Sequence, residues 1–213
     1  SGMIMLTSSL NINKNLTING DNLPTHIGIN GSNAMTVFII SNPVTVTLKG
    51  FNILNGRATY AGFGGAIFIA ASAVNADAMI FSGNTAPGGR GGAIYISMGT
   101  VNVTNSLFQN NGGTNSTNGG AIYNSGGSLT ISSSSFLSNS LGFASAGGAL
   151  YNAAGTIITN STFYGNNGSA GSAIYNASGN VVITNSTISG NTGGAFYNGT
   201  NASVYNSIFA NST

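Results

Sequence analysis

The sequence predicts an all-β protein, a parallel β-helix of about eight coils with three short strands in each coil. The first observation is a repeated phrase, because GGAIY occurs at residues 91–95 and again at 119–123, with near copies before and after it. The second is an alternating phrase rich in Val, Ile, Thr and Asn that follows the copies. The third is that no window shows the sustained apolar periodicity of a helix. Repeats of 20 to 50 residues are typical of solenoids, whose units bury their apolar faces only against their neighbours.

The glycine-rich phrase opens each repeat. Its copies recur every 22 to 28 residues and begin at Gly64, Gly91, Gly119, Gly147, Gly171 and Gly193. One copy, GFGGAI at 62–67, has the look of a phosphate-binding loop, but it lacks the Lys-Ser/Thr ending and opens no helix. We therefore predict that these glycines form corners of the coil.

The second phrase has the period-two alternation of a strand with one buried side. One predicted inward column contains Val103, Ile131, Ile158, Ile183 and Val204. A second inward column follows five residues later and contains Phe81, Phe108, Phe136, Phe163, Ile188 and Phe209. Thr and Ser occupy most of the alternating positions, so we expect them to face solvent.

Asparagine recurs at the bend after the alternating strand. The column consists of Asn105, Asn160, Asn185 and Asn206. Asn tolerates the left-handed conformation that such a corner needs, and stacked Asn amides can hydrogen-bond along a ladder. We predict a structural Asn ladder here. A further Asn column follows the Phe column by three residues and contains Asn84, Asn111, Asn139, Asn166 and Asn191.

An aromatic residue follows the aliphatic residue of each GGA phrase. The column contains Phe68, Tyr95, Tyr123, Tyr151, Tyr175 and Tyr197. If the aliphatic residue points into the core, the ring beside it points outward. An exposed stripe of six rings would be a contact surface. The alternative is that loops cover the rings or that they fold inward as core.

The chain is predicted to form one domain over residues 1–213. Residues 44–213 carry the regular repeats, and residues 1–43 show the same strand and turn pattern less regularly. Eight coils at ~4.8 Å between paired strands would give a rod about 38 Å long.

The composition excludes several classes of partner. Only 3% of the residues are charged, and the Lys and Arg residues are scattered singly, so the sequence favours neither nucleic acid nor an anionic membrane as a partner. No apolar run approaches the ~18 residues of a membrane-spanning helix, so no membrane insertion is expected. The chain contains no Cys, which leaves the redox compartment open.

The residues for catalysis are also scarce. Hydrolysis of a glycosidic bond needs two carboxylates, and the only acidic residues are Asp21 and Asp77, which we expect to lie more than two coils apart. Two Asp residues cannot supply a calcium site, and His26 is predicted to be a solvated loop residue. We predict no enzymatic activity, no metal and no cofactor. Lys49 and Asp77 occupy one outward column and are predicted to pair. Ice binding through paired Thr columns is disfavoured because only one coil keeps both hydroxyls.

The repeat resembles a known family of surface proteins. The pairing of GGA[I/L/F] with FxxN, seen as Gly91-Gly92-Ala93-Ile94 with Phe108 and Asn111, resembles the repeats of chlamydial polymorphic outer-membrane proteins and of adhesin-like proteins of bacteria and archaea. The resemblance covers residues 44–213. It implies a right-handed helix and an extracellular or cell-surface location.

These observations lead to two hypotheses of function. The sequence shows no recognisable capping element and almost no charge at either end, and unpaired strand edges tend to associate. The first hypothesis is therefore a non-enzymatic extracellular structural or adhesin-like rod that associates with itself, head to tail into a fibre or laterally. The alternative is an adhesin passenger fragment that binds glycan or a host or cell-surface protein through the aromatic column.

Overall fold

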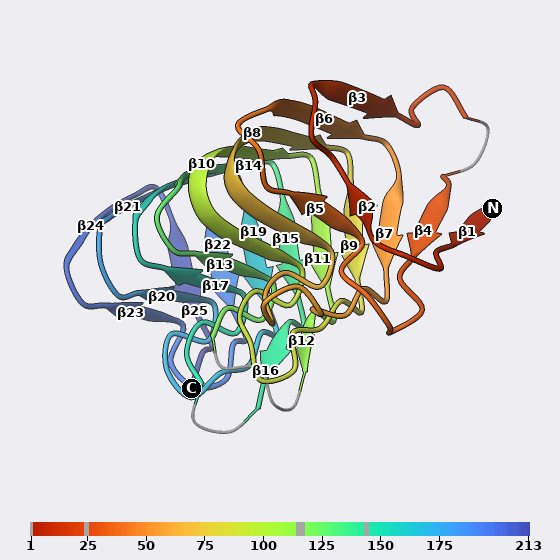
Figure 1. The fold of residues 1–213 in the computed structure, drawn as a ribbon. Coiled ribbons are helices and arrows are strands. Elements are labelled where there is room, and N and C mark those ends of the chain that lie inside the picture. Colours follow the sequence, from red (N-terminus) through yellow and green to blue (C-terminus); the bar gives the residue numbers. More distant parts are fainter. Residues whose placement is uncertain (1, 24–25, 114–117, 143–144) are drawn as a thin grey trace.

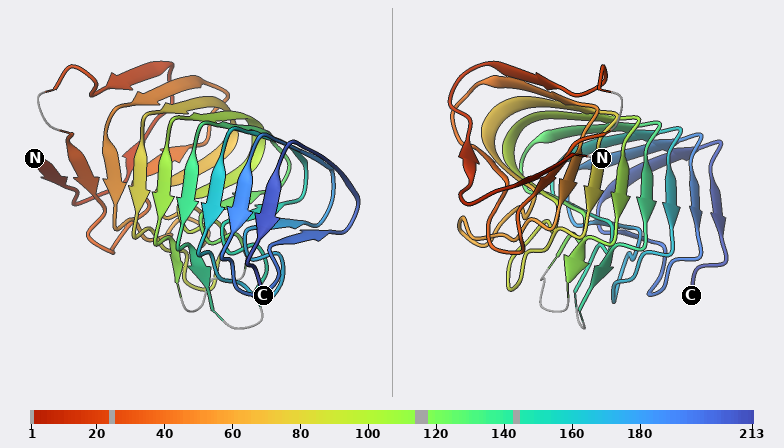
Figure 2. Two further views of the ribbon diagram at one scale, coloured as in Figure 1. Left: turned by 180° about the vertical axis from the view of Figure 1, so that it is seen from behind. Right: turned by 90° about the vertical axis from the view of Figure 1, so that its right-hand side faces the viewer.

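The computed structural model describes residues 2–23, 26–113, 118–142 and 145–213, and over these the chain winds into a rod of stacked coils (Figure 1). These residues form strands and turns only, and all the named strand pairs are parallel. The two labelled ends of the chain lie at opposite ends of the rod (Figure 2). The predicted all-β parallel β-helix is confirmed.

One side of the rod is a sheet of nine parallel strands, one from each passage of the chain. Its strands in spatial order are β1 (Met3–Met5), β4 (Gly28–Asn30), β7 (Asn52–Leu54), β9 (Ile80–Ser82), β11 (Leu107–Gln109), β15 (Ser135–Leu137), β19 (Thr162–Tyr164), β22 (Thr187–Ser189) and β25 (Ile208–Ala210). We call this the small-strand sheet. Successive strands are one circuit apart, so nine strands span eight circuits, in agreement with the predicted eight coils.

The rest of the wall is a larger sheet with two strand positions in each coil. The first position holds β2 (Leu10–Asn11), β5 (Phe38–Ile40), β13 (Ile122–Asn124), β17 (Leu150–Asn152), β20 (Ile174–Asn176) and β23 (Phe196–Asn198). The second holds β3 (Leu16–Asn19), β6 (Thr45–Lys49), β14 (Ser128–Ser132), β18 (Gly155–Thr159), β21 (Asn180–Thr184) and β24 (Asn201–Tyr205). In two coils a single long strand fills both positions, β8 (Ile67–Asp77) and β10 (Ile94–Thr104). A short pair, β12 (Gly112–Gly113) and β16 (Ser140–Leu141), lies outside both sheets.

One residue position distinguishes the merged strands β8 and β10 from the separate strands of the later coils. Ile69 and Ile96 occupy it in the long strands, and Asn124 pairs with Ile96 in the next coil. The side-chain oxygen of Asn124 accepts a hydrogen bond from the amide of Gly127 at 3.0 Å, and this bond closes a turn. Asn competes for backbone groups in this way, whereas Ile favours continued extension. In the coil before β8 the break falls instead at residues 41–44, which contain Pro43, although Ile40 occupies this position.

The core contains the two predicted inward columns in the predicted register. Val103 pairs with Ile131, Ile131 with Ile158, Ile158 with Ile183, and Ile183 with Val204. The rings of Phe81, Phe108, Phe136 and Phe163 are fully buried and stack coil on coil with centroids 4.4 to 4.7 Å apart. Each coil therefore buries its apolar residues against the coils above and below it.

The bend after the second strand has the backbone that the Asn column predicts. The φ angles of Asn105, Asn160, Asn185 and Asn206 are 50°, 49°, 51° and 44°. These four residues are exposed, and the predicted amide ladder is wrong for this column, since the side-chain amide of Asn105 donates its hydrogen bond to Asp77 instead. Exposed amides have water as a competing partner, so they gain little from stacking.

The amide ladder lies instead in the column that follows the Phe residues. Its members are buried, and the side-chain amide of each of the first four donates to the side-chain oxygen of the next at 2.9 to 3.0 Å. They are Asn84, Asn111, Asn139, Asn166 and Asn191. A second ladder joins Asn124, Asn152, Asn176 and Asn198 at 2.7 to 3.1 Å, and its first three members are buried. Burial away from water is what gives these bonds their structural weight.

The glycine-rich phrase forms a corner, as predicted. Gly91 has φ of 68°, and a Cβ there would collide with the carbonyl oxygen of Ile94. At Gly92 a Cβ would collide with the backbone of Gly112 and Gly120, because three passages of the chain meet at this point. The phrase is thus repeated because the close approach of neighbouring coils leaves no room for a side chain.

Candidate functional site

The aromatic column forms a continuous stack on the outer side of the first strand position. Neighbouring rings lie at centroid distances of 4.4 to 5.7 Å and within 13° of parallel. The members are the predicted ones, Phe68, Tyr95, Tyr123, Tyr151, Tyr175 and Tyr197, in the predicted register. We call this the aromatic stack. Its first rings form an apolar cluster with Ile39 that is separate from the main core.

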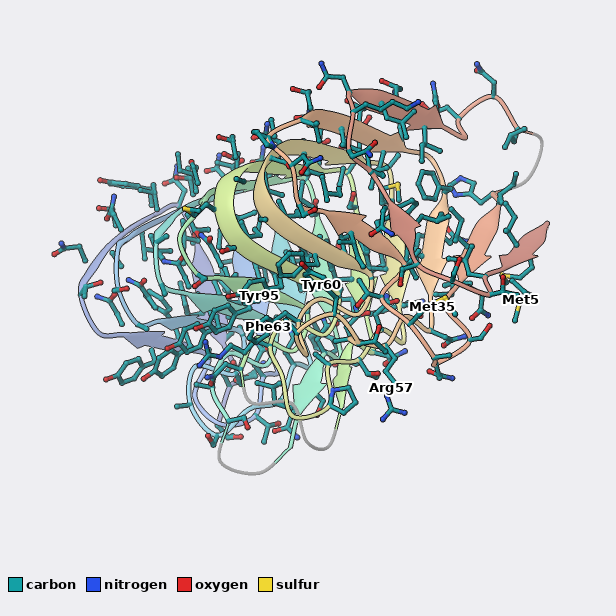
Figure 3. The ribbon with its side chains drawn as sticks, in the orientation of Figure 1. Met5, Met35, Arg57, Tyr60, Phe63 and Tyr95 are labelled. Carbon is teal, nitrogen blue, oxygen red and sulfur yellow. The ribbon has the colours of Figure 1, made fainter. Side chains whose placement is uncertain are left out.

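The prediction that the stack is exposed along its length is wrong for the first three rings. Phe68, Tyr95 and Tyr123 are 8%, 8% and 5% exposed. Two aromatic residues of one loop cover them, because Tyr60 contacts Phe68 edge-on at 4.7 Å and Phe63 stacks on Tyr95 at 4.4 Å (Figure 3). The alternation rule gave the direction of the rings correctly, but it says nothing about which loops return over them.

A cation covers the third ring. The guanidinium of Arg90 lies 5.0 Å from the centroid of Tyr123, a favourable cation–π geometry. Burial raises the pKa of Tyr123 above its usual value of 10.0, partly offset by the positive charge of Arg90. The covered part of the stack therefore contributes to packing rather than to contact with a partner.

The open part of the stack consists of Tyr151 and Tyr175, which are half-buried, and Tyr197, which is 45% exposed. Burial is the largest influence on Tyr175 and raises its pKa. Because the rings stack face to face, they present edges and hydroxyl groups to the side of the rod. Only the outer face of Tyr197, the last ring of the stack, has no further ring of the stack against it.

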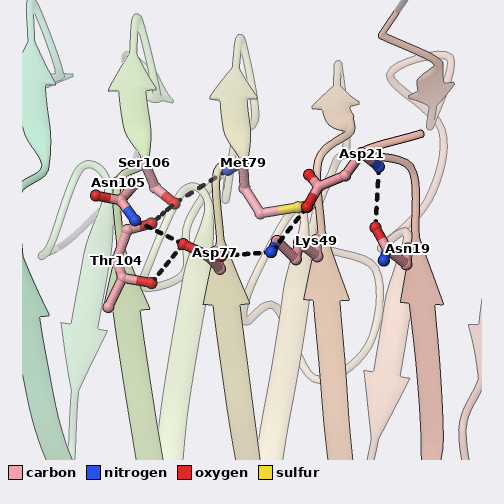
Figure 4. A network of polar contacts seen from close by, with 8 residues as sticks. All are labelled: Asn19, Asp21, Lys49, Asp77, Met79, Thr104, Asn105 and Ser106. Atoms are coloured by element: carbon pink, nitrogen blue, oxygen red, sulfur yellow. Dashed lines mark hydrogen bonds and ion pairs between the residues drawn. The ribbon is translucent and has the colours of Figure 1, made fainter. Parts of the chain in front are cut away.

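Three charged residues, Asp21, Lys49 and Asp77, form two linked ion pairs across three neighbouring coils (Figure 4). The ammonium of Lys49 lies 2.8 Å from Asp21 and 3.4 Å from Asp77. The predicted Lys49–Asp77 pair is confirmed. The expectation that Asp21 and Asp77 lie more than two coils apart is corrected, since each is one coil from Lys49 and both bind it.

The side chains around Asp21 and Asp77 bond to both carboxylates. Hydrogen bonds from Asn105 and Thr104, both at 2.8 Å, are the largest influences that hold the pKa of Asp77 below its usual 3.8, and Lys49 adds to them. The bond to Asp21, followed by that to Asp77, raises the pKa of Lys49 above 10.5. Because these contacts favour the ionised form of Asp77, this carboxyl group is poorly suited to act as a general acid.

Within the described ranges, no three His, Cys, Asp or Glu side chains lie close enough together to hold a metal ion. His26 is exposed, as predicted. The described part of the chain contains no helix long and apolar enough to cross a membrane.

Most of the exposed large apolar side chains among the described residues lie on the two end coils. At one end these are Met3, Ile4, Met5, Leu10 and Leu16, and at the other Tyr197, Val204, Tyr205, Ile208 and Phe209, with exposures between 36% and 60%. The second end is hollowed, and the hollow is lined by residues that include Phe196, Val204 and Phe209. The strands β1 and β25 each have a neighbour on one side only, so their other edges are free in the sheet order.

The fold and repeat together define a right-handed β-helical protein. The chain matches the family model described as the right-handed beta helix region over residues 39–213, so it belongs to this family. The handedness implied by the resemblance is thereby confirmed. Neither the curated proteins nor the solved structures compared with the chain gave a match.

Proposed function

We propose that this chain is a non-enzymatic, extracellular or cell-surface structural protein of the adhesin-like type, a β-helical rod that assembles end to end. The observation that carries the proposal is the pair of end coils, which combine free parallel strand edges with apolar side chains. Phe209 and Val204 are each 41% exposed, whereas their partners Ile188 and Ile183 in the preceding coil are fully buried. Such an edge is a template for further pairing.

Two further observations support the proposal. The chain holds only two carboxylates and both bind Lys49, which argues against acid–base catalysis. The GGA and FxxN repeats resemble those of chlamydial polymorphic outer-membrane proteins and adhesin-like surface proteins, which supports a location outside the cell. The partner at the end coils is a second copy of the chain.

A second candidate is an adhesin-like contact through the open part of the aromatic stack. Tyr151, Tyr175 and Tyr197 support it because their hydroxyl edges face outward over three successive coils. The site is half the length predicted for the whole column. A sugar ring stacks on the face of an aromatic ring, and the faces of Tyr151 and Tyr175 are occupied by neighbouring rings, so glycan contact would be confined to edges and to Tyr197.

Electron microscopy and sedimentation over a concentration series test the first candidate. We expect wild-type protein to form filaments, and Ile208→Asp to abolish them, because a charge on the edge strand opposes pairing. Tyr164→Asp is the matched control, since Tyr164 is 56% exposed on the same sheet but lies on an interior coil. Single rods at every concentration would refute end-to-end assembly, and the Tyr151→Ser and Tyr175→Ser variants in a glycan array would then test the second candidate.

A further inference from the structure

Five tyrosine rings of the aromatic stack lie one above the next within a single chain. From Tyr95 to Tyr197 the centroid distances between neighbouring rings are 5.4, 4.7, 5.1 and 4.4 Å, and neighbouring planes differ by at most 13°. The strands that carry these rings pair in register, so the rings leave the wall in the same direction. Phenol rings held so close are prepared for oxidative coupling, because a bond between two of them needs no encounter of separate molecules.

Tyr175 and Tyr197 form the closest of these tyrosine pairs. Their ring centroids are 4.4 Å apart and their planes differ by 7°. Burial is the largest influence that raises the pKa of Tyr175, and the hydroxyl of Tyr197 adds to it through its charge and a hydrogen bond. The phenol of Tyr175 is therefore protonated at neutral pH. Tyr175 is half-buried, so a proton that its oxidation releases passes to water at the outer edge of the ring.

The covered part of the stack is protected from the same reaction. Tyr95 and Tyr123 are buried, and Phe63 stacks on Tyr95 at 4.4 Å (Figure 3). The guanidinium of Arg90 lies 5.0 Å from the ring centroid of Tyr123, and its positive charge opposes removal of an electron from that ring. Coupling also requires two stacked rings to tilt until their edges meet, which the covering side chains prevent. Oxidation is therefore directed to the open part of the stack.

We propose that Tyr175 and Tyr197 are a site of oxidative modification, at which a one-electron oxidant joins the two phenol rings into dityrosine. Each phenol gives up one electron and one proton, and the two phenoxyl radicals form a carbon–carbon bond between ring positions next to the hydroxyl groups. The hydrogen atoms on those two carbons then move to the oxygens, which restores both phenols. In total the oxidant accepts two electrons, and two protons pass to water.

This bond joins two neighbouring coils through the outer side of the wall. Tyr175 and Tyr197 are directly paired across β20 and β23, so the chain between them makes one full circuit of the rod. A covalent link that closes this circuit restrains the unfolded chain, much as a disulfide does. The chain contains no Cys, so a disulfide cannot supply such a link. Both rings belong to one chain, and the inference is therefore independent of end-to-end assembly.

Photo-oxidation of dilute protein with a ruthenium tris-bipyridyl complex and persulfate tests the site. We expect dityrosine fluorescence in protein that still migrates as a single chain on a denaturing gel, and a mass lower by two hydrogen atoms. Digestion should release a linked peptide that contains Tyr175 and Tyr197, and the melting temperature should rise on oxidation. Tyr175→Phe keeps the stacked ring but lacks the phenol, so it should lose both the single-chain fluorescence and the rise in melting temperature.

Tyr164→Phe and Tyr205→Phe are the matched controls, because both tyrosines are exposed but lie outside the aromatic stack. Both variants should keep the single-chain fluorescence, and thermal melts before oxidation verify that every variant is folded. Fluorescence confined to cross-linked pairs of chains, or undiminished in Tyr175→Phe, would overturn the proposal. A linked peptide from any other tyrosine pair would overturn the assignment of the site, and an unchanged melting temperature in cross-linked protein would overturn its stabilising role.

Discussion

The side-chain amide of Asn111 donates a hydrogen bond to the side-chain oxygen of Asn139 at 2.9 Å, and both residues are at most 1% exposed. The same oxygen of Asn139 also accepts from the backbone amide of Asn111 at 3.0 Å. Asn139 in turn donates to the Phe108 carbonyl and to Asn166, each at 3.0 Å. One side chain thus joins three coils at the point where the backbone turns.

Replacement of Asn139 by Leu should destabilise the rod strongly. It removes four buried hydrogen bonds and leaves the backbone amide of Asn111 without its acceptor, and an unsatisfied buried group costs about 1–3 kcal/mol. We expect urea denaturation to show a loss of at least about 3 kcal/mol. Asn160→Gly is the control, because Asn160 is exposed with φ of 49°, a conformation that Gly adopts freely, and its loss should be under about 0.5 kcal/mol. Similar losses in the two variants would contradict the assigned role of the buried ladder.

The close approach of coils at the glycine corner predicts a sharp contrast between two Gly→Ala substitutions. At Gly92 the new Cβ would collide with the backbone of Gly112 and Gly120, so we expect a loss of more than about 2 kcal/mol. At Gly155 nothing lies within 4 Å of the new Cβ, and reduced freedom of the unfolded chain should leave stability unchanged or raise it by up to about 1 kcal/mol. Thermal unfolding of both variants measures the contrast, and equal melting temperatures would contradict it.

The Asp21–Lys49–Asp77 chain predicts a modest dependence of stability on pH. The pKa of Asp77 is lower in the folded state than its usual 3.8, so its contribution is present above that value and is lost as the pH falls through the folded pKa. The pKa of Lys49 is raised above 10.5, so its contribution is lost as the pH rises through the folded pKa. We expect the melting temperature, measured at a series of pH values, to change little between these two limits and to fall outside them.

Asp77→Asn should remove much of the decline in stability on the acid side while changing the stability at neutral pH by less than about 1 kcal/mol, since the pair is partly exposed. An unaltered acid decline in this variant would assign it to another group. A loss of several kcal/mol at pH 7 would mean that the pair is more deeply buried than its geometry shows.

The repeat by itself determined the class of fold, the number of coils and the register of the columns. Each repeat carries similar inward residues at the same spacing, so alignment of the repeats predicts which residues pair with Val103 and Phe108. The left-handed corner at Asn105 followed for the same reason, since a local backbone conformation depends on local residue type.

Tertiary structure decided the features that depend on contacts between distant or dissimilar segments. Burial decides which Asn column forms a ladder, because hydrogen bonds between side-chain amides hold coils together only where water does not compete for them. Tertiary structure also covered half of the aromatic stack with Tyr60, Phe63 and Arg90, which lie outside the repeated phrases.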